Sequence, residues 1–265
     1  MHQNQSHNPA PCLLYIAPQP IDYGTAWTWQ QSLMADRKLN PDLPDILLIV
    51  EHPPVYTLGQ GADLCHVKFD LENPAIPCHR IERGGEVTYH APGQLVGYPI
   101  LNLQRHQKDL HWYMRQLETV IIDVIDQLLA EQTALSLINH SQSYLVHRRE
   151  GLTGVWISHN SINPDPAKVA QIGIKASRWI TMHGFALNIA MDLDGFSQIV
   201  PCGIADCKVA NVVDFIPTAT YATVQQMILD TFAQQFHLEF VELTNIKNQP
   251  APENRLIINN NDLPK

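Results

Sequence analysis

The sequence predicts an α/β or α+β fold, in which helices pack on a mixed β-sheet. Two long segments carry apolar residues at helical spacing, and most of the chain between them is strand-like. The composition fits a globular protein, because 45% of the 265 residues are apolar and only 16% are charged. A chain of this length can bury most of its unfolded surface in one domain.

Three segments are expected to be helical. Apolar side chains, among them Met114, Leu117 and Ile121, recur three or four positions apart between residues 109 and 132. The same spacing returns between residues 220 and 236, and a weaker helix is expected near 23–36. Strands are expected at 13–17, 45–52, 87–103, 144–158 and 168–190.

The two ends of the chain read as tails. Residues 1–11 are polar and residues 248–265 are rich in Asn and Pro, so we expect a disordered N-terminal tail and a flexible C-terminal tail. No repeat or linker divides the remainder, and we expect one domain over residues 12–247.

Charge and hydropathy exclude several classes of protein. A formal net charge of −9 argues against a nucleic-acid-binding protein, which needs a basic surface. The apolar runs are short, as at 46–50, and no secretory or transit signal opens the sequence. An odd number of cysteines, 5, points to free thiols in a reducing compartment. We therefore expect a cytoplasmic protein without a membrane partner.

The cysteines differ in what surrounds them. Cys12, Cys65 and Cys78 lie in or beside apolar segments and read as buried or incidental thiols. The dipeptides 65–66 and 78–79, both Cys-His, allow a zinc alternative, but their separation does not match the close pairs of a compact structural site. Cys202 differs, because Pro201 and Gly203 place it on a turn that would present the thiol as a nucleophile.

Two further features suggest a binding site. Residues 83–100 read as strand but contain many glycines, which weaken a strand unless something approaches the backbone closely. Residues 167–191 contain Lys168, Lys175 and Arg178 and no acidic residue, so they form a local positive region. Taken one at a time, Lys168, Lys175 and Arg178 are each expected to be solvated surface charges. His90 and His183, next to turn residues, read as histidines with satisfied hydrogen bonds.

Taken together, these segments resemble a known family. The motifs, in order, are EHPPVYTLG at 51–59, RGGEVTYHAPGQLVGYPI at 83–100, GVWI at 154–157, KVAQIGIK at 168–175, RWITMHGFALNI at 178–189 and PCGI at 201–204. They closely resemble the lipoyl(octanoyl) transferases over most of residues 12–217. The resemblance implies the α/β catalytic domain shared by biotin and lipoate protein ligases.

The resemblance also implies the roles of individual residues. Cys202 matches the acyl-accepting cysteine of the family, and Lys168 matches the lysine that activates it. The segments that match the family's substrate-contacting residues are Arg83, Gly84, Gly85, Glu86, Val87, Thr88, Tyr89 and His90, then Gln171, Ile172 and Gly173, and finally Gly184, Phe185 and Ala186. The glycines of the first segment would then lie against an eight-carbon acyl chain.

The activity implied is transfer of an octanoyl group from octanoyl-acyl carrier protein to a lysine. The acceptors would be lipoyl domains of 2-oxoacid dehydrogenase complexes and the glycine cleavage H protein. The thiolate of Cys202 would form an acyl-enzyme that the lysine amine then attacks. Neither ATP, a metal nor any other cofactor is expected, since the incoming thioester is already activated. Lys175 and Arg178 would offer a docking surface for acidic partners.

Four residues, at three places in the chain, depart from the family pattern. Ala91 replaces a glycine and could narrow the pocket or strain the turn, and Gln171 stands where a small residue is common. Ala210 and Asn211 replace hydroxyl residues, and could remove a hydrogen bond near Cys202. Cys207 is expected to be a spectator that could trap Cys202 as a disulfide.

Two other activities fit the same fold. An ATP-dependent lipoate or biotin ligase would share the glycine-rich segment, but it has no use for a positioned cysteine. A binding module without activity could hold the carrier protein without forming an acyl-enzyme. The presence of both Cys202 and Lys168 argues against the second alternative.

Overall fold

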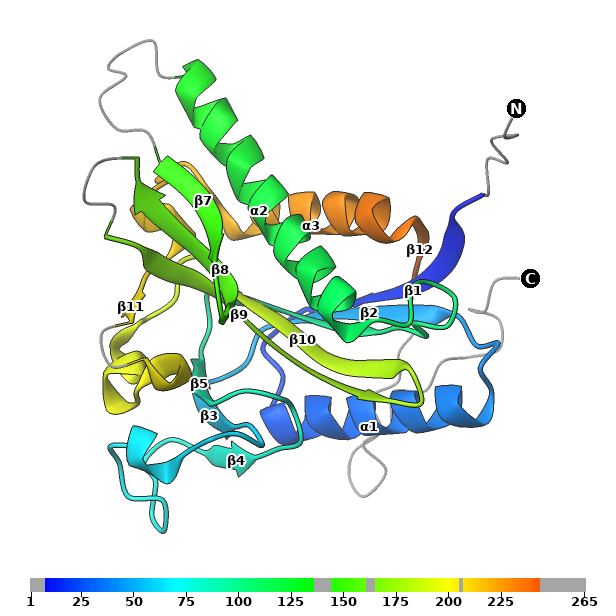
Figure 1. Cartoon of the computed structure of the whole chain (residues 1–265), viewed down its shortest axis with the longest axis horizontal. Helices are drawn as coiled ribbons and strands as arrows, with labels where there is room; N and C mark the ends of the chain where they lie inside the picture. Colours follow the sequence, from blue (N-terminus) through cyan, green and yellow to red (C-terminus); the bar gives the residue numbers. More distant parts are fainter. Residues whose placement is uncertain (1–7, 136–143, 161–164, 205–206, 244–265) are drawn as a thin grey trace.

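The computed structural model describes residues 8–135, 144–160, 165–204 and 207–243. Within them the chain forms a large mixed sheet, a small second sheet and three α-helices (Figure 1). The helices are α1 (Tyr23–Leu39), α2 (Leu110–Leu135) and α3 (Tyr221–Phe236). The large sheet contains β1 (Ala10–Ile16), β2 (Asp45–Val50), β6 (Gln94–Ile100), β7 (Tyr144–Arg149), β8 (Leu152–His159), β9 (Ala167–Ser177), β10 (Ile180–Asn188), β11 (Lys208–Val209) and β12 (Leu238–Glu242). The small sheet contains β3 (Val55–Leu58), β4 (Cys78–Arg80) and β5 (Val87–His90).

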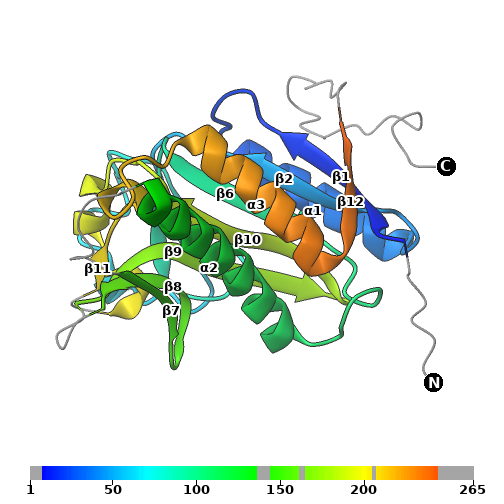
Figure 2. The same ribbon diagram turned by 90° about the horizontal axis from the view of Figure 1, so that it is seen from above.

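The helices cover both faces of the large sheet. Its strands follow the order β12-β1-β2-β6-β10-β9-β8-β7, and β11 pairs with β9. Helix α1 packs on one face, while α2 and α3 lie side by side on the other (Figures 1 and 2). Each face therefore has its own apolar core, with Trp29 and Leu33 of α1 in one and Leu117 and Phe232 of the other two helices in the second. All six residues of β2 are buried, as is typical of a central strand covered on both faces.

A turn divides the glycine-rich stretch between the two sheets. Residues 87–103 do not form one strand as expected, because β5 belongs to the small sheet and β6 to the large one. Between them the chain reverses direction at Gly93, whose φ is 89°. A β-carbon at Gly93 would lie 2.5 Å from the carbonyl oxygen of Ala190, so a side chain is excluded there. The carboxylate of Glu51 accepts the Gly93 N–H at 2.6 Å and fixes the turn.

The segment 168–190 likewise forms two strands, β9 and β10. A two-residue turn joins them, and both Arg178 and Trp179 have positive φ, 52° and 68°. Such left-handed turns match the twist of a β-hairpin. The hairpin places Lys168 at the start of β9, next to β8 on one side and β11 on the other.

The expected helices and most expected strands are present. The sequence did not predict β3, β4, β11 or β12. Strand β1 begins at Ala10, which is two residues before the expected start of the domain. Most of the expected N-terminal tail and the whole C-terminal tail lie outside the described residues. Among the helices that the structure describes, none combines the length and hydropathy needed to cross a membrane.

Candidate active site

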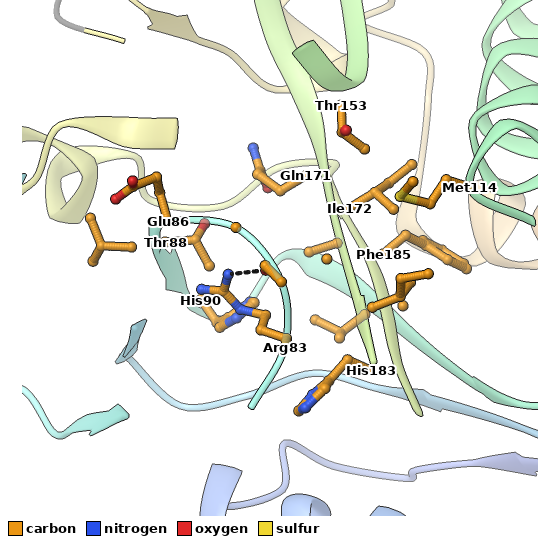
Figure 3. A pocket seen from close by; sticks show the side chains of 18 of the residues that line it. Arg83, Glu86, Thr88, His90, Met114, Thr153, Gln171, Ile172, His183 and Phe185 are labelled. Carbon is orange, nitrogen blue, oxygen red and sulfur yellow. Dashed lines mark hydrogen bonds between the residues drawn. The ribbon is translucent and has the colours of Figure 1, made fainter. Parts of the chain in front are cut away.

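A cavity of about 280 Å³ lies between the small sheet and the β9–β10 hairpin. Figure 3 shows Met114, Ile172 and Phe185 gathered on one side of it, with Arg83, Thr88 and His90 across from them. The first three side chains make one wall apolar, while Arg83, Thr88 and His90 make the opposite wall polar. A largely apolar cavity with a few convergent polar groups is the usual form of a small-molecule site.

The three predicted substrate segments meet in this cavity. Its lining includes Arg83, Gly84, Gly85, Glu86, Val87, Thr88, His90, Gln171, Ile172, Gly173, Gly184, Phe185 and Ala186. Tyr89 is the exception, because its ring packs on the opposite face of β5 against Tyr56 and Phe196. Side chains alternate along a strand, so Thr88 and His90 face the cavity while Tyr89 supports the small sheet from behind.

Lys168 is a buried cation in the wall of the cavity. Only 2% of the residue is exposed, and Nζ donates a hydrogen bond of 2.8 Å to the carbonyl oxygen of Thr153. The ammonium also lies 4.7 Å from the centre of the Trp156 ring. The expectation of a solvated surface charge is therefore wrong for Lys168. A lysine is almost never fully buried unless its ammonium has partners, which here come from the neighbouring strand β8.

Cys202 lies in a single 3₁₀ turn, η3 (Pro201–Gly203), which bears out the expected turn. Its side chain lies outside the part of the structure that can be described. The turn itself is placed by its neighbours: Val200 donates its N–H to the carbonyl of His66 at 2.8 Å. A β-carbon on Gly203 would lie 3.6 Å from Cγ of Glu86, a residue that lines the cavity. The turn that carries Cys202 therefore adjoins the cavity wall.

The glycines of the site are needed mainly for the protein's own packing. A β-carbon at Gly184 would lie 2.3 Å from the carbonyl oxygen of Gly97, and one at Gly173 would lie 3.0 Å from that of Gly84. Gly85 has a φ of 86°, which disfavours any side chain. Gly84 has ordinary contacts, with 3.5 Å to the nearest atom, the carbonyl oxygen of Ile174. These contacts place backbone against backbone, so a ligand is not required to explain three of the four glycines.

The two histidines of the cavity differ in their hydrogen bonds. His90 Nδ1 lies 2.7 Å from the side-chain oxygen of Gln94, as expected for a satisfied histidine. His183 contradicts the expectation, because neither ring nitrogen has a hydrogen-bond partner within the described part of the chain, although only 1% of the residue is exposed. Burial lowers the pKa of each to about 3, and nearby Arg83 adds to the effect. Both are therefore neutral near pH 7.

The positive region expected at residues 167–191 is only partly exposed and partly neutralised in the structure. Lys168 is buried, and Lys175 forms an ion pair of 3.2 Å with Glu82 of the neighbouring loop. Arg178 is exposed on the β9–β10 turn. Residues 167–191 contain no acidic residue, so the sequence did not predict that the fold would place Glu82 beside Lys175.

The departures from the family pattern have local explanations. Ala91 is buried beside Tyr89, does not adopt a positive φ and does not line the cavity, so it neither narrows the pocket nor strains the turn. The side chain of Asn211 binds both the N–H and the carbonyl of Met191, at 3.1 and 3.0 Å. Gln171 does face the cavity, and its Nε2 has no hydrogen-bond partner among the described residues.

The remaining cysteines fit the interpretation of incidental thiols. Cys12 is fully buried, and burial raises its pKa well above the ordinary value. The ring of His66 contacts Glu86, while that of His79 stacks on Tyr23. Within the described ranges, no three His, Cys, Asp or Glu side chains gather in a way that could hold a metal ion.

Several residues that line the cavity were not predicted to do so. They are Tyr23, Val96, Tyr98, Met114, Gly151, Leu152, Thr153, Ile174 and His183. Met114 was expected only as part of the apolar face of its helix. The residues at 151–153 come from the turn and first residues of the β7–β8 hairpin, and no property of their sequence links them to residues 83–90. Only the folded arrangement of the strands brings them together.

Comparison with known proteins identifies the family. The family of the lipoyl protein ligase A/B catalytic domain matches residues 22–233. An octanoyltransferase of Synechococcus elongatus is 49% identical over 234 residues, which cover 88% of this chain and 91% of the relative. An octanoyltransferase of a Nostoc species is 50% identical over 231 residues, with coverage of 87% and 95%. The chain belongs to the octanoyltransferase family.

Solved structures agree with this placement at the level of the fold. A bi-partite lipoate protein ligase of Thermoplasma acidophilum superposes with a TM-score of 0.60 at 17% identity, covering 90% of this chain and 89% of that one. Lipoate-protein ligase A bound with ATP gives a TM-score of 0.61 at 16% identity, with coverage of 89% and 90%. The predicted family, mixed α/β fold and acyltransferase class are thus confirmed. The roles of individual site residues stay predictions.

Proposed function

We propose that this octanoyltransferase takes its octanoyl group from octanoyl-acyl carrier protein and passes it through Cys202 to a lysine of a lipoyl domain. The sulfur of Cys202 attacks the thioester carbon, the bond to the carrier's sulfur breaks and the carrier leaves as a thiol. The amine of the acceptor lysine then attacks the new thioester. The carbon–sulfur bond to Cys202 breaks, an amide forms, and the proton lost by the attacking amine restores the Cys202 thiol.

One observation carries this proposal: the buried ammonium of Lys168 lines the same cavity that the Cys202 turn adjoins. A cation in a low-dielectric wall attracts negative charge as it develops on a reacting thioester. Once it has given its proton to the departing carrier sulfur, the same group is a neutral amine and can take the proton that the acceptor ammonium must lose before it attacks. Volume also supports the assignment, since about 280 Å³ suits a small, largely apolar group.

The partners are proposed from the family. The acyl donor would be the carrier protein, and the acceptors would be lipoyl domains of 2-oxoacid dehydrogenase complexes and the glycine cleavage H protein. The solved Thermoplasma acidophilum ligase was studied with its E2 lipoyl domain, which supports an acceptor of this kind. We further propose that the reaction takes place in the cytoplasm, where a nucleophilic thiol stays reduced.

The test is the mass of the intact protein after mixing with octanoyl carrier protein. We expect the gain of one octanoyl group, mapped to Cys202 by peptide analysis, and its loss on addition of a lipoyl domain. Cys202→Ser should abolish turnover, whereas the matched Cys207→Ser should leave it intact. Modification mainly at Cys207 would contradict the assignment. Activity that needs ATP and free octanoate instead would favour a ligase.

A further inference from the structure

The carboxylate of Glu118 is buried in the middle of α2, where the proposed reaction does not use it. Only 1% of the residue is exposed. Its oxygens accept three hydrogen bonds. Oε1 accepts one from the backbone N–H of Gly154 at 3.0 Å, and Oε2 accepts one from Arg115 Nη1 at 2.6 Å and one from Arg148 Nε at 2.8 Å. A buried carboxylate is costly unless it is paired and hydrogen-bonded, so its contact with a backbone N–H of β8 requires an explanation.

The same peptide group that donates to Glu118 accepts from Lys168. The Gly154 N–H and the Thr153 carbonyl are the two ends of one peptide bond, which is planar, so fixing one end fixes the direction of the other. Glu118 holds the N–H end, and Lys168 Nζ donates to the carbonyl end at 2.8 Å. A carboxylate on the N–H also polarises the carbonyl and makes it a stronger acceptor.

We propose that Glu118 is a positioning residue for Lys168, acting through the Thr153–Gly154 peptide. The lysine chain packs directly against this peptide, since a β-carbon on Gly154 would lie 2.5 Å from Cε of Lys168. The peptide therefore sets the position of the ammonium both by hydrogen bonding and by contact. The carboxylate on α2 thus determines where the cation of β9 stands in the cavity wall.

The arginines have a separate role in holding the hairpin to the helix. Arg148 reaches from β7 to α2, where Nη2 contacts the carbonyl of Arg115 at 3.1 Å and the hydroxyl of Thr119 at 2.6 Å. Arg115 is more exposed, with 51% of its side chain accessible. Replacing the Arg115 side chain removes one ion pair of Glu118 and leaves the Gly154 contact in place. It therefore provides a matched control.

This inference rests on the proposed role of Lys168 in transferring octanoyl to the acceptor lysine. If Glu118 acts through Lys168, its removal should matter only while Lys168 is present. A residue that merely supports the fold would slow the reaction whether or not Lys168 is present. The two cases separate in a double-mutant cycle.

The experiment measures single-turnover transfer from octanoyl-Cys202 to a lipoyl domain in four proteins: wild type, Glu118→Met, Lys168→Met and the double variant. We expect Glu118→Met to slow transfer by about 10- to 100-fold in the wild type, as for a lost hydrogen bond to a charged group. In the Lys168→Met background we expect a further change below about twofold. Arg115→Met should change transfer by less than about twofold in either background.

Three results would overturn the inference: no effect of Glu118→Met, an equal effect in both backgrounds, or an effect of Arg115→Met as large as that of Glu118→Met. Should Glu118→Met fail to fold, Glu118→Asp takes its place, because it keeps the charge near the flexible arginines and withdraws it from the fixed Gly154 N–H. The same outcomes then decide. If Lys168→Met alone leaves transfer unchanged, the proposed role of Lys168 is wrong. That result differs from the three above, so failure of the Lys168 role can be told apart from failure of the Glu118 role.

Discussion

Trp156 and Lys168 are direct partners on neighbouring strands, and the Lys168 ammonium lies 4.7 Å from the centre of the Trp156 ring. The tryptophan is fully buried. The negative face of an indole attracts a cation, and the attraction reaches about 2 kcal/mol when water is excluded. The ring therefore supplies part of what keeps a buried lysine stable in the cavity wall.

We predict that Trp156→Leu destabilises the protein more than Trp156→Phe does. Both changes remove volume from the core, but phenylalanine keeps an aromatic face toward Lys168. The additional loss in the leucine variant should be about 1 to 2 kcal/mol in the free energy of unfolding, measured by urea denaturation. Equal stability of the two variants would show that ring volume alone matters and that the cation does not depend on the ring.

For Lys168→Met we predict a stronger effect on the transfer of octanoyl to the lipoyl domain than on the acylation of Cys202. Lowering the pKa of an ordinary cysteine by about 1.5 units raises the thiolate fraction roughly 16-fold, but reduced nucleophilicity removes close to fivefold of that gain. The net benefit of about threefold is small beside proton transfer, which contributes about 10² to 10⁴. Single-turnover rates of the two half-reactions decide, and a larger loss in acylation would refute the base role.

We predict that Gly84→Ala and Gly85→Ala affect different properties. A methyl group at Gly84 meets nothing closer than 3.5 Å, and the residue lines the cavity, so this variant should fold normally and raise KM for the acyl donor. Gly85 has a φ of 86°, so its alanine variant should lose about 1 kcal/mol of stability. Melting temperatures and initial rates on the same samples test both expectations. A Gly84→Ala variant with unchanged KM would remove Gly84 from the acyl-binding wall.

The sequence predicts the elements of this fold better than it predicts their connections. The helical spacing around Leu117 and the apolar run of β2 are local signals, and both elements form as expected. The division of residues 87–103 between two sheets is not local. It depends on the approach of Gly93 to Ala190, nearly one hundred positions away in the chain. Short edge strands such as β4 and β11 carry too few residues for a period to be recognised.

The motifs predict part of the candidate site, but the rest of the cavity wall cannot be predicted from the sequence. The motif residues Lys168 and Gln171 both line the cavity, and their roles stay predictions. No motif pointed to Thr153 or Glu118. Thr153 acts through its backbone carbonyl, which does not depend on the residue type. A glutamate on a helix is ordinarily expected to be a surface charge. Lys168 also read as a surface charge by composition. Its burial follows from partners on β8 that only the strand order supplies.

Finally, we predict that the buried ring of His183, which has no hydrogen-bond partner in the described ranges, makes the protein less stable in acid. Burial lowers its pKa to about 3, whereas an unfolded histidine titrates near 6.5. The unfolded state therefore binds the extra proton first, so stability is full above about pH 6.5 and falls as the pH drops toward 3. Between pH 7 and 5 this histidine should account for a loss of about 2 kcal/mol in the free energy of unfolding.

The variant His183→Asn tests this prediction, because asparagine tolerates the φ of 59° and does not titrate. It should remove that part of the loss when urea denaturation is measured at the two pH values. His237→Asn is the matched control, because His237 is exposed and has a similar φ of 55°. If the wild type and His183→Asn lose the same stability between the two pH values, the ring of His183 is hydrated in the folded state and the prediction is wrong.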